Sequence, residues 1–138
     1  MIVLCLDYGE KRSGVAVSDA LGVLACPVTV IHAQGRDTLL RAVADIAEKR
    51  GAERVVLGLP RNMDGSFGEK ARACEALAKQ LEARLKLPVE LWDERMSTVS
   101  AHRALNEANV RGQKRRNVVD AVAAVVILQS YLDRCRRC

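Results

Sequence analysis

Three closely spaced strand patterns open the chain, and alternating helix and strand patterns follow them. Strand-like runs lie at residues 2–7, 14–18 and 23–31, and the short links between them predict an antiparallel meander. Two further strands, at residues 55–59 and after Pro88, each follow a helical pattern, so right-handed crossovers would make them parallel to the first strand. This order predicts an α/β fold in which helices flank a five-stranded mixed sheet.

Helix start and stop signals locate the helices. Asp37 is placed to cap a first helix, and Gly51 is placed to end it. Ser66 and Glu69 have the spacing of a capping box at the start of a second helix. After the fifth strand we expect a short helix from residue 97 or 98 to about 108, a charged loop, and a last helix over residues 118–133.

Length and composition indicate a single domain spanning residues 1–138, because a chain of 138 residues with 49% hydrophobic content can bury its own core. The five cysteines, together with the lack of a signal-peptide pattern or a long apolar span, predict a reduced protein of the cytoplasm that does not enter a membrane. Cys5, Cys26 and Cys74 lie among apolar residues and are expected in the core.

The net charge of +5 is concentrated near the C-terminus. Residues 111–138 hold seven basic and two acidic side chains, so they carry the whole excess. Such an asymmetry points to a polyanionic partner such as nucleic acid. Aromatic residues make up only 3% of the chain, so recognition should depend on phosphate contacts and shape more than on base stacking.

Acidic residues close two of the apolar strand patterns. Asp7 ends the first strand, and the pair Asp93 and Glu94 ends the fifth. If these strands are parallel, their carboxyl ends share one edge of the sheet, where open α/β sheets bind ligands. With Asp120 in the last helix, these carboxylates could hold divalent cations for phosphodiester hydrolysis. Strand alternation places Asp93 and Glu94 on opposite faces, and the pattern alone does not select between them.

Four sequence blocks, in order along essentially the whole chain, resemble the YqgF (RuvX) family, a bacterial branch of the RuvC-like nucleases. The blocks are DYGEKR at 7–12, GLPRNMDGS at 58–66, WDERMST at 92–98, and KRR at 114–116 with Asp120. The resemblance implies an RNase H-like fold and a Mg²⁺- or Mn²⁺-dependent nuclease that processes the 5′ end of the 16S ribosomal RNA precursor. It also implies an alternative activity, the resolution of Holliday junctions in branched DNA.

The resemblance assigns the catalytic metal ligands to Asp7, Glu94 and Asp120, with Asp93 as the alternative to Glu94. Two departures from RuvC itself reduce the number of acids. The fourth strand ends in Gly58-Leu59-Pro60 where RuvC has a glutamate, and the last helix has an alanine where RuvC has a second acid. Whether one or two metal ions bind is therefore open.

Basic residues near these acids are the candidate nucleic-acid ligands. The loop containing Arg61 and Asn62 precedes a predicted helix N-terminus, which favours phosphate. The other candidates are Lys11, Arg12, Arg95, Lys114, Arg115 and Arg116.

Two rival functions belong to other classes. The first block also resembles the phosphate loop of actin-like phosphotransferases, but 138 residues supply only one of the two domains that close around ATP in those enzymes. A catalytically inactive RNA-binding or scaffold domain is the second rival, since a fold does not determine a function. The physiological substrate, the choice between endo and exo cleavage, and homodimer formation are open.

Overall fold

The computed structural model describes residues 1–9, 12–32, 35–59, 68–93 and 112–136, and the side chains of residues 59, 70 and 112–121 lie outside this description. The described elements are β1 (Val3–Asp7), β2 (Arg12–Ser18), β3 (Ala25–His32), α1 (Arg36–Arg50), β4 (Arg54–Leu59), α2 (Glu69–Leu85), β5 (Val89–Asp93) and α4 (Gly112–Arg136). The expected helix at residues 97–108 falls outside the described residues.

The five described strands form one mixed sheet in the order β3-β2-β1-β4-β5. Strands β1, β2 and β3 are antiparallel neighbours, whereas β1, β4 and β5 are parallel. The predicted meander and the predicted parallel strands are therefore both confirmed. Because β1 is the central strand, its carboxyl end lies in the middle of one edge of the sheet.

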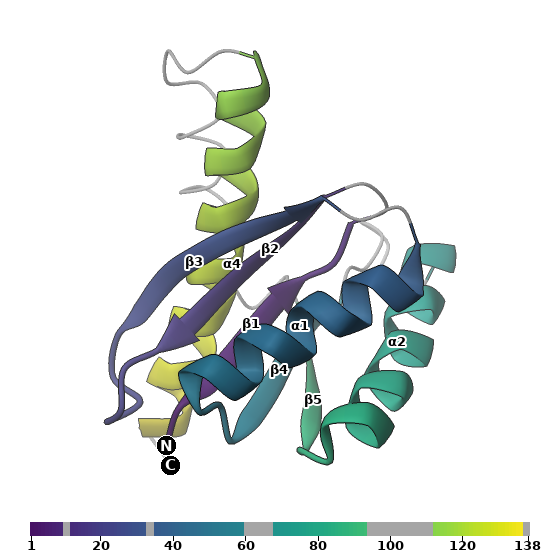
Figure 1. The fold of residues 1–138 in the computed structure, drawn as a ribbon. Helices are drawn as coiled ribbons and strands as arrows, with labels where there is room; N and C mark the ends of the chain where they lie inside the picture. The colour runs from purple at the N-terminus through teal and green to yellow at the C-terminus, as the bar shows by residue number, and fades with distance from the viewer. Residues whose placement is uncertain (10–11, 33–34, 60–67, 94–111, 137–138) are drawn as a thin grey trace.

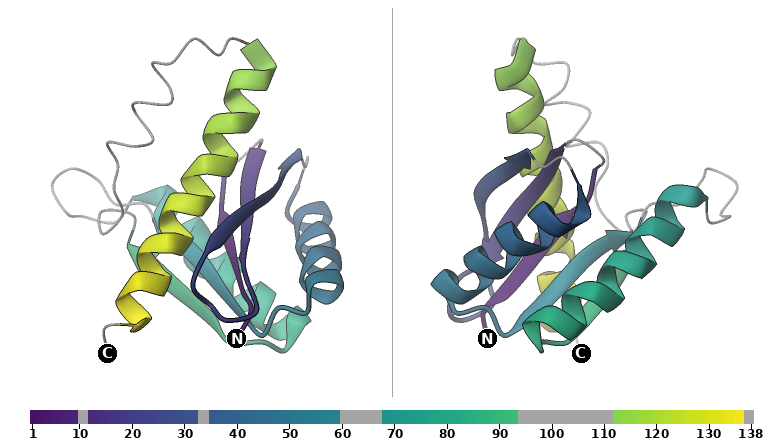
Figure 2. Two further views of the ribbon diagram at one scale, coloured as in Figure 1. Left: turned by 90° about the vertical axis from the view of Figure 1, so that its left-hand side faces the viewer. Right: turned by 45° about the vertical axis from the view of Figure 1, so that its right-hand side comes forward.

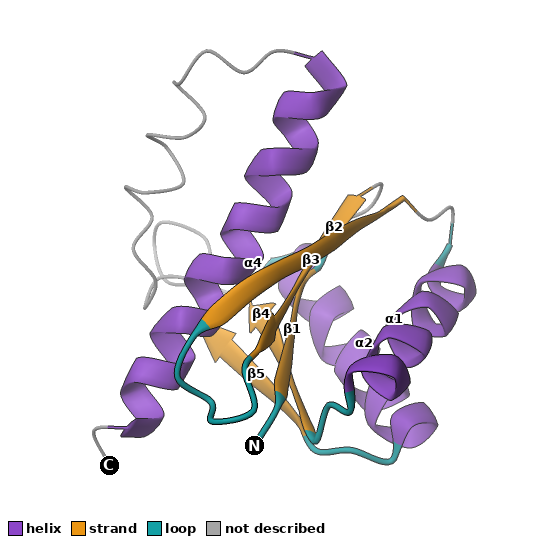
Figure 3. Cartoon of the chain, turned by 60° about the vertical axis from the view of Figure 1, so that its left-hand side comes forward, coloured by secondary structure: helices purple, strands orange, loops and turns teal. Residues whose placement is uncertain are grey.

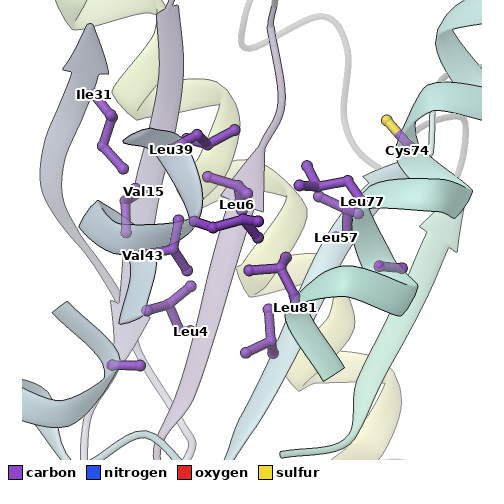
Figure 4. Packing of buried hydrophobic residues seen from close by; sticks show 14 of the residues in the cluster. Leu4, Leu6, Val15, Ile31, Leu39, Val43, Leu57, Cys74, Leu77 and Leu81 are labelled. Carbon is purple, nitrogen blue, oxygen red and sulfur yellow. The ribbon is translucent and has the colours of Figure 1, made fainter. Parts of the chain in front are cut away.

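Helices cover both faces of this sheet. In Figure 3, α1 and α2 lie on one side of the strands and α4 lies on the other. Leu4 and Leu6 of β1 are buried in the cluster formed with α1 and α2, while Val3 and Cys5 are buried in the cluster formed with α4. Figure 4 shows the first cluster, in which Leu57 of β4 lies close to Leu77 of α2. A strand buried on both faces explains why the first apolar run is continuous rather than alternating.

Both predicted helix caps are wrong, although the helices themselves exist. Helix α1 begins after Gly35, no side chain caps it, and Asp37 lies in its first turn. Helix α2 begins after Gly68, so Glu69 is its first residue and not the third position of a capping box begun by Ser66. The predicted end of α1 is confirmed, because Gly51 adopts the left-handed conformation and donates its N–H to carbonyl groups of the last turn.

The last helix begins six residues earlier than predicted. Helix α4 starts at Gly112, so residues 114–116 belong to the helix and not to a charged loop, and Asp120 is more than two turns inside it. Figures 1 and 2 show that the N-terminal part of α4 extends beyond the sheet at the edge where β1 ends. Residues 114–116 therefore lie on a segment that projects past the same edge as Asp7 (Figures 1 and 2).

Two further observations concern predictions from composition. Cys5 and Cys74 are buried as expected, but Cys26 is exposed on edge strand β3, so the prediction that it belongs to the core is wrong. Among the described residues, no helix is both long and apolar enough to cross a membrane.

Candidate active site at one edge of the sheet

The carboxyl ends of β1, β4 and β5 meet at one edge, as the sequence predicts. Register pairs Leu6 of β1 with Leu57 of β4, and Gly58 of β4 with Trp92 of β5. One residue beyond Leu6, Asp7 therefore falls in the same lateral row as Gly58 and Trp92. Neighbouring strands lie about 4.8 Å apart, so the backbones of Asp7 and Trp92 are about 10 Å apart with only a glycine between them.

Strand alternation separates the two candidate acids at this edge. Val3 and Cys5 pack toward α4, so Asp7 lies on the α4 face of the sheet. In β5, Trp92 packs toward α4, whereas Leu91 packs toward α1 and α2. Asp93 therefore lies on the face opposite to Asp7.

The turn that follows Asp7 is closed by hydrogen bonds between Gly9 and Ser13. The Gly9 N–H donates to Ser13 Oγ at 3.2 Å, and Ser13 Oγ donates in turn to the Gly9 carbonyl oxygen at 3.3 Å. Ser13 is only 2% exposed, so both bonds form at a nearly buried side chain. A Cβ atom at residue 9 would clash with the carbonyl oxygen of Arg12, so the close approach of the two chain segments requires glycine. This turn fixes the chain directly after Asp7.

A polar network joins α4 to the two parallel strands on the same face. Arg54 Nη1 donates to Tyr131 Oη at 2.7 Å, and Tyr131 Oη donates to Glu90 Oε2 at 2.7 Å. The ring of Tyr131 also meets the ring of Trp92 edge-on. Burial and the hydrogen bond to Glu90 raise the pKa of Tyr131 to about 12, and the bond to Tyr131 raises the pKa of Arg54. The neutral phenol is therefore the form that holds the network together.

Two buried donors of this network are left unsatisfied among the described residues, Arg54 Nε and the indole N–H of Trp92. Leaving such a donor unsatisfied costs about 1–3 kcal/mol. The ring contact with Tyr131 and the apolar packing against α4 hold Trp92 in place against this cost.

Only part of the predicted site lies in the described chain. Asp7, Arg12 and Asp93 are described, whereas Asp120, Lys114, Arg115 and Arg116 are placed only by the backbone of α4. Lys11, Arg61, Asn62, Glu94 and Arg95 lie outside the described residues. Within the described part of the chain, no group of three or more histidine, cysteine or acidic side chains could hold a metal ion. The predicted ligand set therefore remains a prediction.

The sheet register adds one residue that sequence reasoning missed. His32, the last residue of β3, pairs with Arg12, the first residue of β2, at the edge where β1 ends. His32 is exposed. No local motif marks it, because its partner is set by a register that shifts at a bulge between Val15 and Ala16.

The chain is similar to known proteins along nearly its whole length. A family model described as RuvX, Holliday junction resolvase, matches residues 1–134. A protein of Moorella thermoacetica named "Putative pre-16S rRNA nuclease" is 46% identical over 134 residues, which cover 97% of this chain and 96% of the relative. A protein of Paracoccus denitrificans with the same name is 48% identical over 131 residues, covering 95% of this chain and 83% of the relative.

Solved structures show the same fold at much lower sequence identity. Thermus thermophilus RuvC, in complex with a Holliday junction substrate, matches with a TM-score of 0.64 and 13% identity, covering 98% of this chain and 96% of RuvC. The fowlpox virus Holliday junction resolvase matches with a TM-score of 0.57 and 14% identity, covering 97% of this chain and 99% of the resolvase. The expected RNase H-like fold is thus confirmed. Because the family model matches residues 1–134 and the protein of Moorella thermoacetica is 46% identical over 97% of this chain, the chain belongs to the RuvX family.

Proposed function

We propose that this chain is a divalent-metal-dependent nuclease that hydrolyses phosphodiester bonds at the 5′ end of the 16S rRNA precursor. The observation that carries the proposal is the position of Asp7, which ends the central strand on the face covered by α4. The names of the relatives supply the substrate, and the family supplies the reaction class. Such a role places the protein in the cytoplasm, where ribosomes are assembled.

The faces of the sheet favour Glu94 over Asp93 as the second ligand. Asp93 lies on the face opposite to Asp7, since Leu91 packs toward α1 and α2. Glu90 and Trp92 are the two β5 residues that contact Tyr131 of α4. In the sequence, Glu94 is the next residue in the same alternating set. The alternation and the family resemblance therefore support the same residue.

Helical periodicity favours Asp120 as the third ligand. Residue 120 precedes the fully buried Ala124 by four positions and Tyr131 by eleven. Positions separated by four and eleven residues fall on nearly the same line along an α-helix. Position 120 therefore continues the line along which α4 packs on the sheet, toward the edge that carries Asp7.

The donor set suits Mg²⁺ or Mn²⁺. Asp7, Glu94 and Asp120 all offer carboxylate oxygens, which these hard cations prefer. When bound, the cation would supply a nucleophile from water at neutral pH and would neutralise charge on the reacting phosphate. The closed turn at Gly9 and Ser13 would keep Asp7 in one position for this task.

The nucleic-acid backbone would cross the edge of the sheet that carries Asp7. It would pass between the ends of β2 and β3 on one side and the projecting N-terminal part of α4 on the other. Arg12 and His32 are register partners at the edge that carries Asp7, and alternation from Ala16, which packs toward α4, places Arg12 on the α4 face. The helix α4 carries Lys114, Arg115 and Arg116. Arg12 on one side of the acidic edge and the basic residues of α4 on the other would neutralise phosphates on either side of the cleaved bond. The residues Lys11, Arg61, Asn62 and Arg95 remain candidate contacts from the sequence.

Resolution of Holliday junctions is the second candidate function. The family description names it, and RuvC bound to a junction has the same fold. A resolvase acts as a pair of subunits on a symmetric junction, so this alternative requires a homodimer. An inactive RNA-binding domain remains the alternative of another class.

One assay distinguishes these functions. The purified protein is incubated, across a Mn²⁺ titration, with an RNA that carries the 5′ leader of 16S rRNA and with a four-way DNA junction. The proposed function predicts Mn²⁺-dependent cleavage of the RNA in preference to the junction. Symmetric junction cleavage alone would support the resolvase, and binding of RNA without cleavage of either substrate would support the inactive domain.

A further inference from the structure

We propose that Tyr131 is a positioning residue for the metal site, because it fixes helix α4 against strands β4 and β5. The inference rests on the proposed function, in which one ligand comes from α4 and another follows β5. The relative placement of these two elements then determines whether the carboxylates can share an ion.

The contacts of Tyr131 reach both parallel strands. Its hydroxyl group accepts a hydrogen bond from Arg54 at the start of β4 and donates one to Glu90 of β5, each at 2.7 Å. Arg54 and Glu90 also form an ion pair at 3.7 Å. The ring packs edge-on against Trp92, two residues further along β5. Tyr131 is only 3% exposed, so these interactions form at a buried side chain, where their direction is well defined.

A second polar connection joins α4 to β3, the edge strand on the far side of the sheet from β5. Gln129 Oε1 accepts a hydrogen bond from the Ala25 N–H, and Gln129 Nε2 donates to the Val23 carbonyl oxygen, both at 2.9 Å. These partners lie at and just before the start of β3, at the edge opposite to Asp7, which is also the edge where Arg54 begins β4. Gln129 and Tyr131 thus hold the same stretch of helix, but only Tyr131 bonds to strands that lead to the carboxylates.

The length of α4 makes its orientation important. Residue 120 lies eleven residues before Tyr131, which is about 16 Å along the helix axis. A tilt of about 5° around Tyr131 would therefore move residue 120 by more than about 1 Å. Functional sites tolerate displacements of about 0.5 Å. Apolar packing of Ile127 and Leu128 holds the helix against the sheet, but the hydrophobic effect is non-directional, whereas hydrogen bonds have a preferred geometry.

The test compares two variants that remove polar bonds while keeping the shape of the side chain. Tyr131→Phe retains the ring and loses the hydroxyl group, and Gln129→Met loses the bonds to the β3 end. Mn²⁺ binding is measured from the loss of the free-ion EPR signal, without substrate, and urea denaturation records the stability of each variant. We expect Tyr131→Phe to weaken Mn²⁺ binding by about tenfold, as is typical when a residue that supports a metal site is lost. Gln129→Met should bind Mn²⁺ like the wild type, even if its free energy of unfolding falls as much as that of Tyr131→Phe.

A second pair of variants keeps the test informative if Tyr131→Phe does not fold. Glu90 is partly exposed, so Glu90→Ala should fold, lose the acceptor for Tyr131 and weaken Mn²⁺ binding in the same direction. Glu90→Gln keeps an acceptor oxygen and should restore most of the affinity.

The outcomes separate this inference from the proposed function. Wild-type Mn²⁺ affinity in both Tyr131→Phe and Glu90→Ala would overturn the positioning role, and so would an equal loss in Gln129→Met. A wild-type protein that neither binds Mn²⁺ nor cleaves nucleic acid would overturn the proposed function itself, and the positioning role with it.

Discussion

The ring of Tyr131 in α4 meets the ring of Trp92 in β5 edge-on, with centroids 5.4 Å apart and planes at 87°. Edge-to-face geometry is favourable for aromatic pairs because the positive edge of one ring faces the negative face of the other. The contact connects the last helix, which carries Asp120, with the strand that leads to Asp93 and Glu94. The proposed metal site requires a defined placement of α4 relative to β5.

The ionisation of Tyr131 should make stability depend on pH in an alkaline window. Burial is the main cause that raises its pKa from 10.0 to about 12. The unfolded chain then loses the phenolic proton first, so the stabilisation is complete below pH 10 and is lost as the pH rises toward 12. We expect urea denaturation to show that the stability advantage of the wild type over Tyr131→Phe shrinks across this window. A constant advantage would contradict the structural account of Tyr131.

Gly9→Ala should disrupt the turn that follows Asp7. The new Cβ would clash with the backbone carbonyl oxygen of Arg12, which cannot move without opening the bonds between Gly9 and Ser13. Overpacking of this kind costs about 1–3 kcal/mol. The unfolding free energy should fall by this amount and Mn²⁺-dependent cleavage should fall further than in Ser13→Ala, which removes side-chain bonds without adding volume. Full activity in Gly9→Ala would show that the turn does not position Asp7.

Replacing Lys114, Arg115 and Arg116 together by alanine should weaken nucleic-acid binding for all sequences about equally, since phosphate contacts carry no sequence information. The slope of log affinity against log salt should decrease by about 0.7–0.9 for each lost contact. The matched control replaces three exposed basic residues of α1, on the other face of the sheet: Arg41, Lys49 and Arg50. An equal change of slope in both triple variants would show that α4 is not a specific interface.

Arg12→Ala and His32→Ala test the other side of the proposed path. Arg12 begins β2 and His32 ends β3 at the edge that carries Asp7, so each variant should weaken RNA binding measured at one fixed salt concentration. Unchanged affinity in both variants would place the nucleic acid away from the β2–β3 end of the edge.

Glu94→Gln and Asp93→Asn separate the two acids that close β5. Because Asp93 lies on the face opposite to Asp7, Asp93→Asn should retain most of the cleavage, whereas Glu94→Gln should lose it. The measurement is the initial rate of RNA cleavage at saturating Mn²⁺. The reverse result would keep a metal mechanism and assign the ligand to Asp93.

The strands and their acidic ends could be predicted from the sequence because each depends on a local pattern. A short apolar run such as residues 2–6 has few alternatives to forming a strand that is buried on both faces. Short links between consecutive strands force them to pair antiparallel. The start of α4 could not be predicted in this way, because a basic run resembles a solvated loop. Lysine, arginine and glutamine are nevertheless good helix formers, and the helix extends through them to Gly112.

The errors at the caps and the missed contacts have a common physical cause. A cap contributes only about 1 kcal/mol, so its sequence signal is weak, and glycine stands at the start of both α1 and α2 instead. The network around Tyr131 joins residues 41 and 77 positions apart, and the pairing of Arg12 with His32 depends on a β-bulge. Such relationships arise from tertiary packing and leave no local signal in the sequence.

The most direct test of the account is the Mn²⁺-dependent cleavage of the 16S precursor RNA by Asp7→Asn, compared with wild type and with Asp45→Asn. Asp45 is an exposed carboxylate of α1 that pairs with Lys49, so its variant controls for the loss of one negative charge. We predict that Asp7→Asn abolishes cleavage while RNA binding persists, that Asp45→Asn cleaves like the wild type, and that EDTA stops wild-type cleavage. Full cleavage by Asp7→Asn, or wild-type cleavage that EDTA does not reduce, would contradict the account.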